Sequence, residues 1–318
     1  MDMRRSFARL ISFLEEKNSF LLYLCIFLIL CGGLYYSFEL GSKLRYTDEE
    51  EYYMIAQNMA HSFTYSLDGI NPTAYRPPGY PVILYICDIV GLGIQATRFV
   101  DFLFLSGSLF FLNLLLKKNV NSSVASLAVI LSFCYPLFFY AAGTLYPQTF
   151  GSFLFLMILY VLLSKKKLSV PQLGLTGVLY GYLVLTIPTF LSVIFVILFI
   201  LLFTRLNIKS IVIIIVSGFI VLSVWAVRNY AVFDSVIFTS TNSGINLLLG
   251  NSKNTTPNSG VNVDISEYEK MTRQLNEVQQ DSFYRSQAVQ FISNNPSKAF
   301  SLYFMKFLNY FNYRNDLA

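Results

Sequence analysis

Long apolar runs constrain what this chain can fold into more than any other feature of its sequence. We place them at about residues 20–40, 97–116, 122–141, 150–163, 172–188, 190–204 and 209–226. A helix of about 20 apolar residues crosses the hydrocarbon core of a bilayer, and helix ends inferred from sequence are uncertain by about 2–4 residues. The runs therefore predict an all-α polytopic membrane protein with about seven transmembrane helices. A final aromatic run at 299–313 predicts an eighth helix, either cut short or lying at the membrane surface.

The boundary between the fifth and sixth runs admits two interpretations. Pro188 favours a break between two helices, since proline donates no backbone hydrogen bond. A single bent helix over 172–204 is the alternative, and it would invert the topology of everything that follows. Arg205 and Lys209 favour the two-helix interpretation because they mark a cytoplasmic loop.

Charged residues are scarce and follow a topological pattern. They make up 13% of the chain, against about 25% in a typical soluble domain, while hydrophobic residues make up 55%. The basic residues cluster before the first run (Arg4, Arg5, Arg9, Lys17) and after the second (Lys117, Lys118), the fourth (Lys165, Lys166, Lys167) and the sixth (Arg205, Lys209). By the positive-inside rule the N-terminus is cytoplasmic, and residues 41–96, 143–149 and 227–297 are external. The net charge of +5 thus indicates topology, and we expect no nucleic-acid partner. No cleavage site follows the first run, which we interpret as an anchor.

Cysteine and histidine give no sign of a disulfide framework or a zinc site. Cys25, Cys31 and Cys134 lie in apolar runs, and Cys87 lies near the membrane surface. The one histidine, His61, is interpreted as a solvated or capping residue. We predict no resident metal, although one or two carboxylates with a lipid phosphate offer an alternative site for a divalent cation.

An acidic segment in the first external loop is the main candidate for chemistry. Thr47 and Glu50 form a capping-box pattern, which predicts a helix start with Asp48 and Glu49 in its first turn. A water-facing helix end explains these acids without any function, since the helix dipole favours them there. Tyr52 lies one turn after Asp48, however, and a shared face would hold an acid at the mouth of an apolar cleft, where it becomes a better base.

A rigid segment follows in the same loop, Tyr75-Arg76-Pro77-Pro78-Gly79-Tyr80-Pro81. Its prolines fix the backbone and so hold Arg76 in place. A turn that leads to a surface helix explains the prolines, whereas Arg76 is a candidate ligand for a lipid phosphate. Arg228 and Asn229 end the seventh run, where an arginine either reaches the head groups or binds a phosphate.

The last external loop combines a polar segment with an amphipathic one. Residues 240–262 are rich in Asn, Ser, Thr and Gly, which form turns through side-chain to backbone hydrogen bonds. From 264 to 294 apolar residues recur at helical spacing and predict a helix that ends before Pro296. These apolar residues are Met271, Leu275, Val278, Ala288, Phe291 and Ile292.

Several pieces of the chain, taken in order, resemble one family of membrane enzymes. They are the acidic pair Asp48-Glu49, YRPPGYPVILYI at 75–86, LYPQTFGSFLFL at 145–156, WAVRNYAVFDSVIFTSTNSGINLLLGNS at 225–252 and YRSQAVQFISNNP at 284–296. The set is similar to the bacterial members of the dolichyl-phosphate-mannose–protein mannosyltransferase-like family, polytopic GT-C glycosyltransferases that use polyprenyl-phosphate sugars. The resemblance implies a GT-C-type bundle of about seven to eight transmembrane helices, with surface-lying helices in the first external loop.

The resemblance also implies a reaction on the external face of the bacterial cytoplasmic membrane. Asp48, or next to it Glu49, would take the proton from an acceptor hydroxyl as its oxygen attacks the anomeric carbon of the lipid-linked sugar. Arg76 and Arg228, with Asn229, would bind the leaving polyprenyl phosphate. The expected substrate-lining residues are Tyr52, Tyr75, Tyr80, Gln148, Asn242, Asn246 and Asn251. The implied partners are the lipid-linked sugar, an acceptor glycan, lipid or protein, and membrane lipids, and no cofactor is evident.

Two features depart from the family pattern. Related enzymes often carry an acid in the loop between the third and fourth helices, where this chain has Gln148, so we expect Gln148 only to hydrogen-bond the substrate. The chain also stops after one further apolar segment, where relatives continue with several helices. A compact, truncated or inactive member is therefore an open alternative.

Two other classes of function remain open. A transporter or lipid flippase usually places ionisable groups at mid-membrane, whereas Arg98 and Asp101, which lie inside the run at 97–116, are near its outer end. Their placement favours catalysis at the membrane surface over a transport pathway through the membrane. A non-catalytic subunit that keeps the scaffold is the third alternative, and sugar transfer by the purified protein would separate it from an enzyme.

Overall fold

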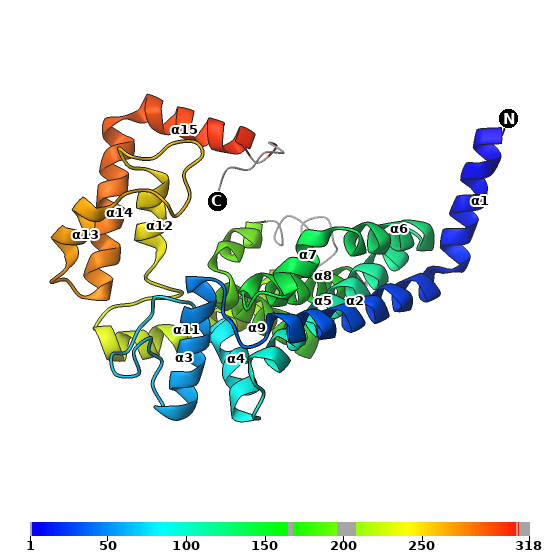
Figure 1. Ribbon diagram of the computed structural model, residues 1–318, viewed down its shortest axis with the longest axis horizontal. Coiled ribbons are helices and arrows are strands. Elements are labelled where there is room, and N and C mark those ends of the chain that lie inside the picture. The colour runs from blue at the N-terminus through cyan, green and yellow to red at the C-terminus, as the bar shows by residue number, and fades with distance from the viewer. Residues whose placement is uncertain (1, 165–167, 196–207, 310, 312–318) are drawn as a thin grey trace. The chain divides into compact units, whose positions relative to one another are not determined.

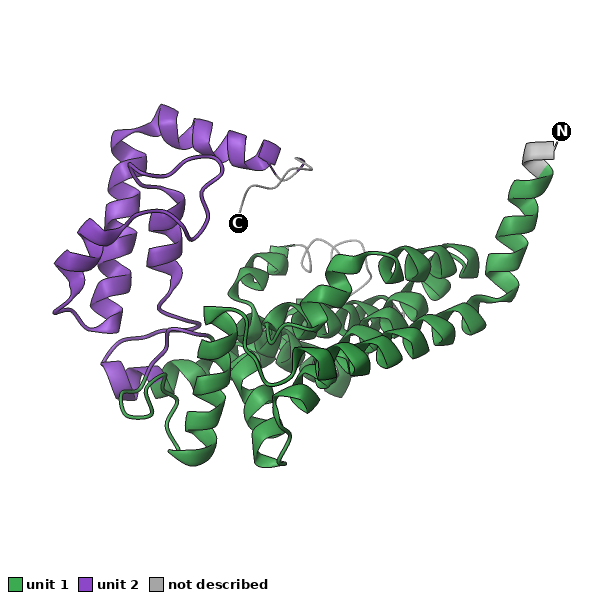
Figure 2. Cartoon of the chain, in the orientation of Figure 1, with its two compact units in different colours: residues 1–72, 77–228 green, residues 73–76, 229–318 purple. Residues whose placement is uncertain are grey.

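Helices form all the regular structure in the part of the chain that the computed structural model describes, which is residues 2–164, 168–195, 208–309 and 311 (Figure 1). The all-α prediction is confirmed for these residues. Figure 2 divides the chain into two compact units. Unit 1 contains residues 1–72 and 77–228, and unit 2 contains residues 73–76 and 229–318.

Unit 1 holds most of the described helices. They are α1 (Asp2–Glu16), α2 (Asn18–Leu40), α3 (Thr47–His61), α4 (Gly79–Ile89), α5 (Ile94–Asn119), α6 (Ser122–Phe133), α7 (Pro136–Ala142), α8 (Pro147–Ser164), α9 (Val170–Thr186), the 3₁₀ helix η1 (Pro188–Ser192) and α11 (Ile208–Phe233), whose last residues belong to unit 2. The helices α2, α5 and α6 pack against one another, and α8 packs along α5.

Three of the described helices are long and apolar enough to cross a membrane, namely α2, α5 and α11. They have 23, 26 and 26 residues, and they confirm the helices predicted at 20–40, 97–116 and 209–226. At 1.5 Å per residue each of them exceeds the roughly 30 Å of a hydrocarbon core. Length and composition therefore support the prediction of a membrane protein.

A fourth span arises only if α6 and α7 are counted together, because the pair is bent by 64°. The prediction of one helix over 122–141 is wrong at this point. Pro136 begins α7, and Tyr135 before it is extended (φ −90°, ψ 101°). A residue that precedes proline is driven away from helical torsions, so the chain must turn there.

The predicted spans at 150–163 and 172–188 correspond to α8 and α9, which are apolar but shorter. The break after α9 is confirmed, since Ile187 is extended (φ −137°, ψ 98°) directly before Pro188. The run predicted at 190–204 falls largely outside the described residues. The described chain thus has three to four apolar helices that could span a membrane, and a bundle of seven to eight spans stays a prediction.

The main core of unit 1 lies among α3, α4, α8 and α9. Tyr52, Tyr80 and Leu145 are buried in it. Beside this core α9 and α11 approach each other closely: a Cβ on Gly177 would lie 2.3 Å from the carbonyl oxygen of Ile214. Small residues permit such close contact between membrane helices, so any side chain here would force the two helices apart.

The described part of unit 2 consists of α12 (Ser243–Gly250), α13 (Ser266–Thr272), α14 (Glu277–Asn294) and α15 (Pro296–Asn309). Its core contains Leu248, Ile265, Tyr284 and Ala288, with α12 packed along α14. Residues 73–76 of the first long loop belong to this unit as well, and they supply the Tyr75 and Arg76 singled out in the sequence.

The prediction of one continuous amphipathic helix over 264–294 is wrong, because two helices, α13 and α14, cover this range. Asn276 starts a separate helix, because its side chain accepts a hydrogen bond from the Gln279 N–H at 2.9 Å while Gln279 bonds back to the Asn276 N–H at 3.1 Å. This is a capping box, which divides α13 from α14. The final aromatic run forms α15, where Phe300 and Tyr303 are 72% and 73% exposed.

Asp68 closes the loop that follows α3. Its carboxylate accepts hydrogen bonds from the Asn71 side-chain amide (2.7 Å), from the backbone N–H groups of Asn71 (2.7 Å) and Ile70 (2.9 Å), and from the Ser66 hydroxyl (2.8 Å). These bonds, the Asn71 amide first among them, hold the pKa of Asp68 well below its usual value.

We expect this loop to loosen in acid. The folded-state pKa of Asp68 is lowered, so its hydrogen bonds stabilise the loop fully above the unfolded-state pKa of about 4. This stabilisation is lost as the pH falls toward the lowered pKa. Amide hydrogen exchange should show falling protection factors at Ile70 and Asn71 between about pH 5 and pH 2. Asp68→Asn should show low protection throughout this range. Constant protection in the unmodified protein would contradict the expectation.

Candidate functional site

The acidic segment forms the first turn of α3, as predicted. Asp48, Glu49 and Glu50 all lie in that turn. The capping box expected from Thr47 and Glu50 is wrong, because the cap residue is Tyr46 and the cap has no side-chain hydrogen bond. The Glu50 N–H bonds instead to the Tyr46 carbonyl oxygen at 3.1 Å. The helix dipole is thus the local feature that favours the three carboxylates here.

Glu49 points into the protein and is completely buried. Its Oε2 accepts a hydrogen bond from the Arg45 N–H at 2.6 Å, and its Oε1 accepts one from the Leu145 N–H at 2.8 Å. The guanidinium groups of Arg45 and Arg98 each lie 4.0 Å from the carboxylate. A charge removed from water requires such partners, and Glu49 has both hydrogen bonds and opposite charges.

Arg45 and Arg98 extend this cluster to the surrounding backbone. Arg45 donates through Nη2 to the Gly143 carbonyl (2.9 Å) and to the Thr144 hydroxyl (2.6 Å). Arg98 is buried in α5 and donates to the carbonyl oxygens of Gly41 (2.6 Å) and Lys43. We call Arg45, Glu49 and Arg98 the Glu49 cluster. It fixes the start of α3 to the 143–146 loop.

Sequence reasoning missed the two arginines of this cluster. Arg98 carried a signal, since an ionisable residue within an apolar run is normally paired or functional. Arg45 lies four residues before Glu49, the spacing that brings side chains together on a helix. Neither signal identifies Leu145 or Gly143 as partners, because about a hundred residues of chain separate them from the acid.

Asp48 is half-buried beside the Glu49 cluster. We expected Tyr52 to share a helix face with Asp48 at the mouth of a cleft. This expectation needs correction, because the Tyr52 side chain is buried in the core. The ring of Tyr52 meets that of Tyr80 edge-on at 5.6 Å, and the Tyr80 hydroxyl donates to Asp101 at 2.6 Å. Both tyrosines therefore stabilise the packing beneath α3, and a substrate-lining role for them stays a prediction.

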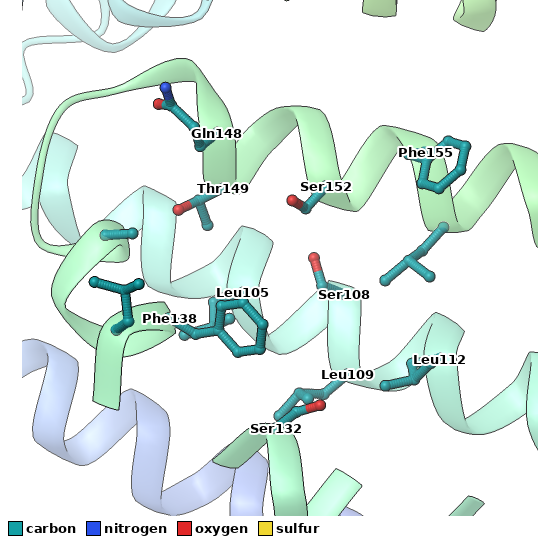
Figure 3. A pocket seen from close by; sticks show the side chains of 13 residues that line it. Leu105, Ser108, Leu109, Leu112, Ser132, Phe138, Gln148, Thr149, Ser152 and Phe155 are labelled. Carbon is teal, nitrogen blue, oxygen red and sulfur yellow. The ribbon is translucent and has the colours of Figure 1, made fainter. Parts of the chain in front are cut away.

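Gln148 lies at the start of α8, exposed and three residues after Leu145. It lines one end of a cavity of about 480 Å³ formed by α5, α7 and α8 with Ser132 of α6 (Figure 3). The other residues that line the cavity are Leu105, Ser108, Leu109, Leu112, Ser132, Leu137, Phe138, Ala141, Thr149, Ser152, Phe155 and Leu156. Ser108 and Ser152 point toward each other across it, whereas most of the wall is hydrocarbon.

Arg228, near the end of α11, lies against two aromatic rings that also contact each other. Its guanidinium carbon lies 4.9 Å from the ring centre of Trp225 and 5.4 Å from that of Tyr65, and it donates to the Tyr65 carbonyl oxygen at 3.2 Å. These contacts give the arginine a defined position. Asn229 is completely buried and donates to the Ile237 carbonyl at 2.9 Å, so its amide secures the chain after α11 and is not exposed to a phosphate.

In unit 2, Glu277 holds the segment that carries Tyr75 and Arg76. The Glu277 carboxylate accepts hydrogen bonds from the Thr73 hydroxyl (2.6 Å) and the Ala74 N–H (2.8 Å), and also from the Thr241 hydroxyl. The Arg76 guanidinium lies over the ring of Tyr75 at 5.2 Å. A phosphate-binding role for Arg76 stays a prediction.

The three asparagines of unit 2 lie around α12. Asn242 precedes the helix and accepts a hydrogen bond from the Ser240 hydroxyl at 2.9 Å. Asn251 follows the helix and donates to the Leu247 carbonyl at 3.0 Å, whereas Asn246 is exposed on α12. The Asn251 bond is a side-chain to backbone bond of the kind predicted for this polar segment, whereas the Asn242 bond joins two side chains and does not cap α12.

The predicted site residues are divided between the units. Unit 1 holds Asp48, Glu49, Tyr52, Tyr80, Gln148 and Arg228, and unit 2 holds Tyr75, Arg76, Asn229, Asn242, Asn246 and Asn251. Within unit 1 the structure brings the acidic turn and the 143–149 loop together, two segments that were expected on the same face. Among the described residues no group of three or more His, Cys, Asp or Glu side chains is arranged to hold a metal ion. His61 is exposed and lies 3.2 Å from Asp88.

Comparison with known proteins does not assign the chain to a family. No protein-family model matches it, and no curated protein matches it either.

Proposed function

We propose that the chain is an inverting GT-C-type glycosyltransferase. It moves a sugar from a polyprenyl-phosphate donor to a hydroxyl group of an acceptor glycan, lipid or protein on the external face of the bacterial cytoplasmic membrane. The observation that carries the proposal is the fixed acidic turn: Asp48 sits directly beside Glu49, which two backbone N–H groups and two arginines hold against the 143–146 loop. Rigid support of this kind is what a catalytic group needs.

Asp48 is the proposed general base. Its carboxylate takes the proton of the acceptor hydroxyl while that oxygen forms a bond to the anomeric carbon. The bond from the anomeric carbon to the phosphate oxygen breaks, and its electron pair leaves with the polyprenyl phosphate. Glu49 has a different part in this proposal, since a buried carboxylate whose two oxygens already accept hydrogen bonds cannot reach a substrate. It positions the turn that carries Asp48.

The apolar cavity beside Gln148 suits the lipid part of the donor. A polyprenyl chain is hydrocarbon, and leucine and phenylalanine side chains make up most of the cavity wall. Ligand cavities commonly have volumes of about 300–1,000 Å³, so 480 Å³ accommodates a few isoprene units. Arg228 is the proposed phosphate ligand of unit 1, because its guanidinium is positioned by Trp225 and Tyr65.

The charged groups within α5 do not favour the transporter alternative. Arg98 donates hydrogen bonds to backbone carbonyls of the segment before α3, and the Asp101 carboxylate accepts a hydrogen bond from the Tyr80 hydroxyl. Both groups thus support the acidic turn and its packing and do not form a polar path. Structural pairing of this kind explains why two ionisable residues are retained near one end of an apolar helix.

Transfer of a radiolabelled sugar by the purified protein tests the proposed function. The full chain in lipid nanodiscs is supplied with polyprenyl-phosphate sugars and with glycan, lipid or peptide acceptors. Release of polyprenyl phosphate together with a labelled acceptor supports the proposal. Activity that appears only after a second polypeptide is added makes the chain a subunit, and no transfer in either case rejects the proposal.

Filling the cavity should weaken use of long-chain donors. Ser152→Phe places an aromatic ring in the cavity and should displace about one isoprene unit, which raises the KM for a long-chain donor about tenfold. A donor with a very short prenyl chain should be little affected. Ser152→Ala removes the hydroxyl but leaves the space open, so it is the matched control. An equal KM for the long-chain donor in both variants would place the lipid elsewhere.

A further inference from the structure

Unit 2 contains a second cavity, of about 370 Å³, which differs in chemistry from the apolar one. Its walls come from the 73–76 segment, from the start of α12, from α13 and from the first turns of α14. Its lining residues include Tyr75, Glu269, Thr272, Arg273, Gln280 and Tyr284. Polar side chains from separate segments thus converge on one hollow, as is typical of a binding site.

Hydroxyl groups are buried in one wall of this cavity. The Thr272 and Tyr284 hydroxyl oxygens lie 2.8 Å apart, and these residues are 1% and 7% exposed. Each hydroxyl can donate one hydrogen bond and accept others. Gln280 is fixed beside them, because its amide donates to the Leu275 carbonyl at 2.9 Å. These hydrogen bonds give the wall an ordered, polar surface.

The charges around the cavity disfavour an anionic ligand. Glu269, Glu277 and Asp281 line it together with Arg273. Glu277 and Asp281 are structural, since they accept hydrogen bonds from Ala74 and Gly244 respectively, and Asp281 is also paired with Arg285 at 2.8 Å. A phosphate would still meet the carboxylates of Glu269 and Glu277 against the single guanidinium of Arg273 in the lining, and like charges at short range repel each other. A neutral ligand with several hydroxyl groups meets both donors and acceptors without that repulsion.

We propose that this cavity binds a sugar ring of the acceptor, so that the acceptor of the reaction is a glycan. The inference rests on the proposed function, which left glycan, lipid and protein acceptors open. Glu269 accepts hydrogen bonds from sugar hydroxyls, Arg273 donates to them, and Tyr75 supplies an aromatic ring for the apolar face of the sugar. The volume suits one monosaccharide unit with its linkage to the next.

Saturation-transfer NMR on the purified full chain in detergent micelles tests this site. The probes are methyl glucoside and N-acetylglucosamine, each supplied separately, with inorganic phosphate as a competitor. We expect transfer to at least one sugar and no displacement by phosphate. The double variant Glu269→Ala/Arg273→Ala should reduce the transfer at least about fivefold, since each lost hydrogen bond weakens binding several-fold. Lys270→Ala, an exposed change on α13 outside the cavity lining, is the matched control.

Each contrary result overturns the inference. No transfer to either sugar means that the cavity is not a sugar site, and displacement by phosphate makes it an anion site. Equal transfer in the double variant and the control puts the sugar elsewhere. Failure of the proposed function has a different signature: sugar binding that depends on Glu269 and Arg273 would persist while the purified protein transfers no labelled sugar.

Discussion

Asp48→Asn is expected to reduce sugar transfer by about 10²–10⁴-fold, the range that a positioned general base contributes. Asparagine has nearly the same size as aspartate and still forms hydrogen bonds, but it cannot take a proton. Asp48 is half-buried in the first turn of α3, so the exchange should leave folding and membrane insertion unchanged. The measurement is the initial rate of label transfer from lipid-linked donor, at equal amounts of inserted protein.

Glu50→Gln is the matched control for this experiment. Glu50 lies in the same turn and is exposed, so its exchange removes the same charge without removing the proposed base. Its transfer rate should stay close to that of the unmodified protein. A normal rate in Asp48→Asn would reject Asp48 as the base, and equal losses in the two variants would attribute the effect to charge near α3 in general.

The apolar helices were predictable because hydropathy and length are local properties. α2, α5 and α11 were each expected from one continuous run. The bend between α6 and α7 had a local cause too, since Pro136 was visible in the sequence, but the apolar residues on both sides concealed it. The helix α1 was missed because its first residues were interpreted only as a basic flank of the first span.

The contrast between the half-buried Asp48 and the fully buried Glu49 was not predictable from the sequence. Neighbouring residues on a helix point about 100° apart, so only one of two adjacent acids faces the protein interior. Which one does so depends on where Leu145 and Arg98 lie, and these are tertiary contacts. The sequence favoured Asp48 as the base on resemblance, and burial of Glu49 gives that choice a physical reason.

The tyrosines show a related limit of sequence patterns. A tyrosine has an apolar ring and a polar hydroxyl, so it suits both a core and a substrate site. Tyr52 and Tyr80 lie in the core, where the Tyr80 hydroxyl finds a partner in Asp101. Tyr75, only five residues before Tyr80, belongs to unit 2 because Glu277 holds its segment there. No local pattern separates these two outcomes.

Glu49→Ala is expected to destabilise the protein by about 3–5 kcal/mol, because breaking a buried ion pair leaves the other charge without compensation. The charge left behind is Arg98, which is completely buried. The N–H groups of Arg45 and Leu145 also lose their acceptor. Denaturant titration of the full chain in detergent should show the loss, and Glu50→Ala, an exposed exchange in the same turn, should change the free energy of unfolding by less than about 0.5 kcal/mol.

A double-mutant cycle shows whether the loss comes from the pair itself. Arg98→Leu alone leaves Glu49 buried with one guanidinium fewer and removes the bonds to Gly41 and Lys43, so it too should destabilise the protein. With both exchanges the uncompensated charge disappears, and the combined loss should be smaller than the sum of the single losses by about 0.5–3 kcal/mol. Additive losses would mean that Glu49 acts through its backbone hydrogen bonds and not through Arg98. Then Arg98 would stabilise only the segment before α3, and the partners that stabilise Glu49 would be the two N–H groups and the guanidinium of Arg45.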